Sequence, residues 1–181
     1  MNLKNFKLQN KLGMIVAYSY GRGIGFKNKI PWHIPEDYKF FKKVTTNEPN
    51  SRIVMGKNTW QSLPRKPLKD RENIILSSSL SLSEVKKYNN IKIFPEKDSL
   101  DKYIAEKKAP TWIIGGEQVY FSYINDPNLK YIFVTDIVNE FIYDTIFPKM
   151  PDYFKLEYLG NFKNYNGLKY YNIVYKNRNI E

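Results

Sequence analysis

A single carboxylate, that of Asp37, occupies a position where an apolar residue is expected. It lies in the segment IGFKNKIPWHIPEDYKFFK, residues 24–42. Pro35 suits the first turn of a helix, and Asp37 then shares the i, i+3, i+4 spacing of a buried helix face with Phe40 and Phe41. Such an acid can simply stabilise the helix N-terminus, by about 0.3–1 kcal/mol. In apolar surroundings, however, burial raises a carboxyl pKa and marks a candidate acid, base or ligand anchor.

Thr135 is a candidate partner for this carboxylate. It lies within the hydrophobic run LKYIFVTDIV, where a hydroxyl that points inward needs a hydrogen-bond partner. Asp37 is one candidate for that partner. The alternative is that Thr135 is only a β-branched residue, of the kind that favours a strand.

Two glycine-containing segments could bind phosphate. In VMGKNTW, Gly56 follows a strand-like run and precedes Lys57 and Thr59. In IIGGEQVY, Gly115 and Gly116 separate a strand-like run from a helix-like one. Glycine lets a backbone approach a ligand closely, and the N-terminal end of a helix favours an anion. Each signal alone is also explained by a tight turn or by an ordinary surface lysine.

Other familiar motifs fail on their context. GRGIGF resembles a dinucleotide fingerprint, but its third glycine comes one position early and the residues after it cannot open a helix. MGKNT would need a glycine at Ser51 to be a phosphate loop. The only histidine is His33, which excludes a multi-histidine metal site, and the absence of cysteine excludes disulfides and thiol catalysis.

Strand-like and helix-like segments alternate along the chain. The expected strands span residues 13–20, 52–56, 72–79, 91–94, 111–116 and 129–138. The expected helices span residues 35–46, 57–63, 99–108 and 117–124, with Ser99 as an N-cap of the third. Two β-rich runs around Asn166–Gly167 predict a C-terminal hairpin.

This order predicts an α/β fold with an open, mainly parallel twisted sheet, flanked by helices and closed by an antiparallel C-terminal hairpin edge. We expect residues 1–12 to be a flexible extension and residues 13–181 to form a single domain. Ligands bind beyond the carboxyl ends of the strands in such sheets. Asp37, Gly56 and the Gly115–Gly116 pair all follow expected strands, so they would meet at that edge.

Composition limits the class of protein. The chain has 181 residues, 42% of them hydrophobic, which is enough for one folded domain. No apolar run is long enough to span a membrane, and we expect a cytoplasmic protein without a membrane partner. The formal charge of +11 raises the question of nucleic-acid binding. The 24 lysines and 5 arginines are scattered, however, so a solvated basic face is the favoured interpretation.

Six motifs in order give the chain a specific resemblance. They are IGFKNKIPWHIPEDYKFFK, VMGKNTWQSLP, RENIILSS, IIGGEQVY, VTDI and DTIFP. On these motifs the chain resembles the dihydrofolate reductase family, and the resemblance extends over about residues 13–177. The resemblance implies NADPH-dependent reduction of 7,8-dihydrofolate to tetrahydrofolate, a reaction of one-carbon metabolism. Hydride would pass to pterin C6, and N5 would be protonated.

The resemblance also implies which residues form the site. The catalytic group would be Asp37, Trp32, which orients a water, Thr135, and Ile30 on a mobile loop. The substrate would contact Ile15, Val16, Ala17, Asp37, Phe41, Leu63, Arg71, Ile114, Tyr120 and Thr135. NADPH would contact Ala17, Ile24, Gly56, Lys57, Asn58, Thr59, Leu76, Ser77, Ser78, Ile114, Gly115, Gly116, Glu117, Gln118, Val119 and Tyr120.

The chain departs from the family pattern at two of these positions. Glu117 stands where a third glycine is common, and Lys57 stands where many relatives carry arginine. No metal is implied. The implied ligands are dihydrofolate and antifolates such as methotrexate, and the implied state is a monomer or one domain of a fusion with thymidylate synthase. Two alternatives remain: a reductase of the same fold acting on a flavin-pathway pyrimidine, and a non-catalytic basic binding protein.

Overall fold

The structure is a computed structural model that describes residues 1–180. Its helices are α1 (Pro35–Thr45), α2 (Lys57–Ser62), α3 (Leu82–Val85), α4 (Lys97–Lys107) and α5 (Glu117–Tyr123), with short 3-10 turns η1 (Leu3–Asn5) and η2 (Tyr20–Arg22). Its strands are β1 (Leu12–Ser19), β2 (Gly23–Gly25), β3 (Arg52–Gly56), β4 (Glu72–Leu76), β5 (Ile91–Phe94), β6 (Thr111–Ile113), β7 (Leu129–Ile137), β8 (Thr145–Ile146), β9 (Phe154–Leu159), β10 (Lys163–Tyr165) and β11 (Leu168–Asn177).

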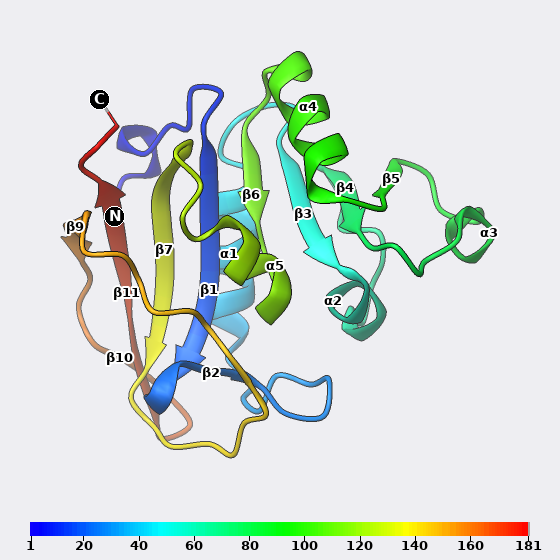
Figure 1. The fold of residues 1–181 in the computed structure, drawn as a ribbon. Helices are drawn as coiled ribbons and strands as arrows, with labels where there is room; N and C mark the ends of the chain where they lie inside the picture. The colour runs from blue at the N-terminus through cyan, green and yellow to red at the C-terminus, as the bar shows by residue number, and fades with distance from the viewer. Residues whose placement is uncertain (181) are drawn as a thin grey trace.

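One twisted sheet organises the molecule (Figure 1). Its strand order is β10-β11-β7-β1-β6-β3-β4-β5, and β9 also pairs with β11. The strands from β7 to β5 pair in parallel, whereas β11 pairs antiparallel with β7, β9 and β10. The turn between β10 and β11 has positive φ at Asn166 and Gly167, as the hairpin signal predicts. The predicted mainly parallel sheet with an antiparallel C-terminal edge is therefore confirmed.

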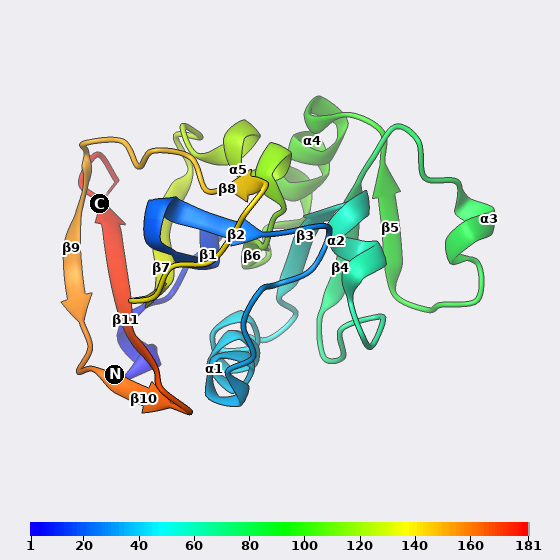
Figure 2. The same ribbon diagram turned by 90° about the horizontal axis from the view of Figure 1, so that it is seen from below.

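Helices cover both faces of the sheet. Figure 2 shows α1 on one face and α4 and α5 on the other. Alternation along β1 divides its side chains between two cores, because successive residues of a strand point to opposite faces. Val16 belongs to the core on the α5 side with Tyr120, whereas Ile15 belongs to the core on the α1 side with Val44. Among residues 1–180, no helix is long and apolar enough to cross a bilayer.

The N-terminal segment differs from the flexible extension that we expected. Leu3, Phe6 and Leu8 are buried in the core on the α1 side. The ring of Phe6 packs edge-on against that of Phe133, with 5.6 Å between their centroids. Three apolar side chains among lysines form too short a pattern to show periodicity, yet the segment contributes to the core.

Several boundaries differ from the expected ones for local reasons. The fourth strand ends at Leu76 and not at Ser79, because the Ser77 hydroxyl oxygen accepts hydrogen bonds from the N–H groups of Ser79 and Leu80. Strand β6 ends at Ile113, two residues before Gly115, whose φ of +103 is incompatible with a regular strand. The short strand β2 was not among the expected strands; it pairs with β8.

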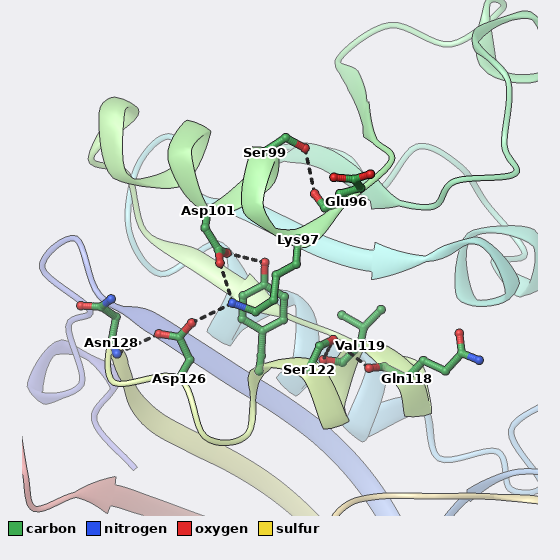
Figure 3. Close-up of polar contacts among 10 residues, drawn as sticks. Glu96, Lys97, Ser99, Asp101, Gln118, Val119, Ser122, Asp126 and Asn128 are labelled. Carbon is green, nitrogen blue, oxygen red and sulfur yellow. Dashed lines mark hydrogen bonds and ion pairs between the residues drawn. The ribbon is translucent and has the colours of Figure 1, made fainter.

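Helix α4 begins two residues earlier than expected, so Ser99 is not its N-cap. The Ser99 hydroxyl donates to the backbone oxygen of Glu96 at 2.8 Å instead (Figure 3). The helix is tied to its neighbours by Lys97, whose Nζ lies 2.5 Å from Asp101 and 3.2 Å from Asp126. The pair with Asp101 lies within α4, whereas the pair with Asp126 joins α4 to the loop that leads into β7, on the face of the sheet opposite α1.

Candidate functional site

Helix α1 presents a row of functional side chains spaced by four residues. The Oδ1 atom of Asp37 accepts a hydrogen bond of 2.6 Å from the Thr135 hydroxyl on β7. One turn further, Phe41 packs against the core on the α1 side. At the end of the helix, the Thr45 hydroxyl oxygen accepts a 2.5 Å hydrogen bond from Arg71. The predicted contact between Thr135 and Asp37 is therefore present.

The environment of Asp37 favours its protonated form. Its side chain is half-buried, and Thr135 beside it is 1% exposed. Burial raises the pKa of the Asp37 carboxyl above its ordinary value, while the hydrogen bond from Thr135 and the positive charge of Lys163 oppose that shift. Such a carboxyl can hold a proton at a higher pH than a solvated aspartate, which is a requirement for a general acid.

The sequence reasoning missed two residues behind this pair. Asn172 on β11 donates from Nδ2 to the Thr135 hydroxyl oxygen at 2.9 Å. Its own Oδ1 accepts from Lys163 Nζ at 2.8 Å. Asn172 interrupts the apolar run YYNIVY, and that interruption is the one sequence signal that could have identified it. Its contacts depend on the pairing of β7 with β11, which no local pattern specifies.

Of the residues just before α1, some are packed into the protein and others are exposed. Trp32 is buried, and its ring lies 5.4 Å from that of Phe141. Ile34 is buried in the same cluster, which Ala17 also contacts. Ile30 is 52% exposed and is not packed onto the site in this structure.

The β1 residues divide between the two faces of the sheet. Ala17 stands opposite Thr135 in the parallel register, so both point to the α1 side. Val16 points to the α5 side, so only its backbone could contact a ligand bound on the α1 side. Tyr120 is buried on that same side and donates from its hydroxyl to the backbone oxygen of Ile15 at 2.8 Å. This bond ties α5 to β1.

Arg71 lies near Phe41, at the end of α1 that is farther from Asp37. Its guanidinium carbon is 5.6 Å from the centre of the Phe41 ring, and its Nε donates to the Lys69 backbone oxygen at 3.0 Å. Burial lowers the pKa of Arg71 from its ordinary value, and the charge of Asp70 opposes that shift. Leu63 and Ile114 pack against the same core. Aromatic, aliphatic and cationic groups thus follow one another away from Asp37.

A second cluster forms where β3 and β6 end. The Gly56 N–H donates to the Gly115 backbone oxygen at 2.8 Å, and the Gly115–Gly116 peptide bond is cis. A Cβ on Gly116 would lie 3.2 Å from the Thr59 hydroxyl oxygen. Helices α2 and α5 both begin here, so their first backbone N–H groups and the two glycine-containing turns together form a cradle. Such a cradle suits phosphate oxygens.

Lys57 connects this cradle to the end of β4. Its Nζ donates to the backbone and hydroxyl oxygens of Ser79, each at 3.3 Å. Ser78 is exposed and lies next to this contact, and Ser77 follows Leu76 at the strand end. Lys57 therefore lies at the serine-rich segment that follows β4, and its contact there is with Ser79.

The other expected cofactor residues differ in how far their side chains are available to a ligand. The Glu117 carboxylate accepts a 2.8 Å hydrogen bond from the Ile146 N–H on β8, so its side chain is directed away from the glycines. Val119 is buried in the core on the α5 side, which leaves only its backbone for a ligand. Gln118 and Asn58 are exposed, and Ile24 lies half-buried in β2.

Residues 11–177 match the family model described as dihydrofolate reductase. The chain belongs to the dihydrofolate reductase family. It is 34% identical over 182 residues to the dihydrofolate reductase of Rattus norvegicus, covering 92% of this chain and 97% of that one. It is 36% identical over 181 residues to the viral dihydrofolate reductase of Saimiriine herpesvirus 2, covering 91% and 84%. It is 33% identical over 150 residues to the dihydrofolate reductase of Heliothis virescens, covering 78% and 81%.

Membership of the dihydrofolate reductase family makes the chain an oxidoreductase with a nicotinamide cofactor. The family fold agrees with the observed sheet and its antiparallel C-terminal strands. Within residues 1–180, no group of three or more acidic or histidine side chains is arranged to hold a metal ion. The candidate site therefore has two parts, the surroundings of Asp37 and the glycine cradle.

Proposed function

We propose that the chain reduces 7,8-dihydrofolate to 5,6,7,8-tetrahydrofolate with NADPH. The observation that carries this proposal is the Asp37 carboxylate, half-buried and bonded to Thr135, at the same sheet edge as the Gly56–Gly116 cradle. Family membership supports the substrate class. The alternatives of a flavin-pathway pyrimidine and of a non-catalytic basic protein lack a comparable observation.

Asp37 is proposed as the acid that promotes protonation of the substrate. With Oδ1 engaged by Thr135, the other carboxylate oxygen can bind the N3–H and 2-amino groups of the pterin. Bound NADPH supplies the hydride, two electrons that form the new C–H bond at C6. The accompanying proton reaches N5, and a carboxyl whose pKa is raised by burial promotes that step, typically by about 10²–10⁴-fold.

The neighbouring side chains orient the substrate in this proposal. Phe41, Leu63 and Ile114 pack on the pterin and benzoyl groups, and Ile15, Ala17 and Tyr120 close the inner end. Arg71 holds the glutamate carboxylate of the substrate, for which a planar guanidinium is suited. Trp32 orients a water beside Asp37, and Ile30 belongs to the segment that closes over the bound ligands.

The cradle is proposed to hold the phosphates of NADPH. Backbone N–H groups at Gly116, Glu117, Gln118 and Val119 face the pyrophosphate, together with Asn58 and Thr59. Lys57 and Ser77–Ser78 bind the 2′-phosphate of the adenosine, which favours NADPH over NADH. Leu76 and Ile24 contact the apolar parts of the cofactor. The close approach of Gly116 to the Thr59 hydroxyl, which leaves little room for a side chain there, supports this proposal.

Ligands and setting follow from the same proposal. Antifolates such as methotrexate would occupy the substrate site, because they share the pterin-like edge that Asp37 binds. We also propose a cytoplasmic location and action as a monomer or as a domain joined to thymidylate synthase.

The test is the consumption of reduced cofactor by the purified protein with dihydrofolate, compared between NADPH and NADH. Turnover that prefers NADPH and stops with methotrexate is the expected result. Lys57→Met should reduce the preference for NADPH over NADH. The matched control, Lys86→Met, should leave that preference unchanged. Turnover of the flavin-pathway pyrimidine, with none of dihydrofolate, would overturn the proposal, as would a folded protein that turns over neither.

A further inference from the structure

A row of polar side chains crosses three strands behind Asp37. In the sheet register, Thr135 on β7 pairs with Ala17 on β1 and with Asn172 on β11. Paired residues point to the same face, so this row lies on the side of α1. Thr135 is 1% exposed and Asn172 is 5% exposed. Two polar side chains inside an apolar sheet need hydrogen-bond partners, and they supply each other with them.

The row continues to the surface through Lys163 on β10. Lys163 Nζ donates to Asn172 Oδ1 at 2.8 Å. The same ammonium lies 5.5 Å from the centre of the Tyr170 ring, which favours a cation over its face. Although the lysine is exposed overall, its charged end is therefore held against the sheet by two contacts. An exposed hairpin is connected in this way to the acid at the centre of the site.

The chemistry of these groups fixes the direction of every hydrogen bond. A lysine ammonium only donates, so the Asn172 oxygen must face it and the amide nitrogen must face Thr135. The Thr135 oxygen then accepts from Asn172, and its single proton is free for Asp37. All three donors point toward the carboxylate. An asparagine side chain does not pass a proton along such a chain, so its role is orientation.

We propose that Asn172 and Lys163 are positioning residues that hold the Thr135 hydroxyl as a donor to Asp37 and thereby set the pH range in which that acid works. The inference rests on the proposed function, because it concerns the acid of that reaction. It adds two residues outside the substrate and cofactor contacts. It also assigns a role in catalysis to the β10–β11 hairpin.

The electrostatics of the site agree with this geometry. The charge of Lys163 and the bond from Thr135 both lower the pKa of Asp37 against the effect of burial. The other titratable groups facing Asp37 are Tyr38, Tyr120 and Tyr170, and burial raises the pKa of each phenol, so all three are neutral near pH 7. Glu36 is adjacent but exposed. Lys163 is thus the cation that acts on this acid.

The first test is the pH dependence of hydride transfer in a single turnover. Transfer should be fast at low pH and slow down as Asp37 ionises. Lys163→Met removes the charge, so the pKa of Asp37 rises and the decline moves to higher pH by about 0.3–1 unit. Asn172→Ala frees the Thr135 hydroxyl and should shift the decline in the same direction. Lys169→Met is the matched control, since it removes the same charge from the opposite face of β11 and should leave the decline almost unchanged.

A second measurement separates this inference from the proposed function. The carboxyl of Asp37 can be titrated by NMR in protein labelled with ¹³C-aspartate, with Asp37→Asn to assign the signal. This titration needs no turnover, so it tests the inference even if dihydrofolate is not the substrate. A titration midpoint raised by Lys163→Met and not by Lys169→Met supports it. Equal shifts in both variants, or none in Lys163→Met, would overturn it, and because Lys163 is exposed its replacement should not unfold the protein.

Discussion

At the scale of single residues, the proposed acid Asp37 is unfavourable for stability. Burial raises the pKa of its carboxyl in the folded state above the value of the unfolded chain. The folded state therefore binds the proton more tightly, and stability falls as pH rises from the unfolded pKa to the folded one. Above that window the ionised carboxylate costs stability at every pH.

Replacing this acid should separate the two effects. Asp37→Asn keeps the shape and can still accept the hydrogen bond from Thr135, but it has no charge to bury. We expect a higher thermal midpoint at pH 7, together with a loss of turnover of about 10²-fold or more. Calorimetry of both proteins at pH 3.5 and pH 7 measures the first effect, since the gain should shrink at the lower pH. A lower midpoint at both pH values would show that the carboxylate is not destabilising.

The sequence allowed part of this arrangement to be predicted. Helical spacing placed Asp37 on the buried face of α1, and the hydroxyl of Thr135 needed a partner, so their contact could be expected before the fold was known. Asn172 and Lys163 could not be found in that way, because their contacts arise from pairing between β7, β10 and β11. The face to which Val16 points could not be predicted either, since resemblance identifies a position but not the direction of its side chain.

At the scale of elements, alternation of strand-like and helix-like runs predicted the sheet well. The N-terminal segment was the main error, because burial there depends on a surface made by distant strands. Leu8 is fully buried and approaches Gly13 so closely that a Cβ on the glycine would lie 3.0 Å from the leucine side chain. The segment thus completes the core on the α1 side.

Truncation of Leu8 tests that contribution. Leu8→Ala should lower the free energy of unfolding by about 2–4 kcal/mol, because it removes buried methyl groups and leaves a cavity. Leu82→Ala is the matched control, since Leu82 is 74% exposed and should change stability by less than about 0.5 kcal/mol. Urea unfolding of the three proteins measures both values. Equal, small changes would mean that the segment does not pack in solution.

At the scale of the whole molecule, the charge of +11 concerns the ligands more than the fold. Dihydrofolate and NADPH are both anionic, so a basic surface should raise their local concentration at the site. Raising the ionic strength from about 0.05 M to about 0.5 M shortens the Debye length to a few ångströms. The KM for both ligands should then rise severalfold while kcat changes little. An unchanged KM, with the thermal midpoint also unchanged, would show that the surface charge does not steer them.

The most direct measurement is the rate of hydride transfer in a single turnover, from pH 5 to pH 9, for the natural protein and Asp37→Asn. We predict a plateau at low pH, then a decline of about tenfold per pH unit once Asp37 ionises. Asp37→Asn should be slower throughout and show no plateau, because protonation of N5 then depends on solution alone. Equal rates for the two proteins at neutral pH would contradict the central role of this acid.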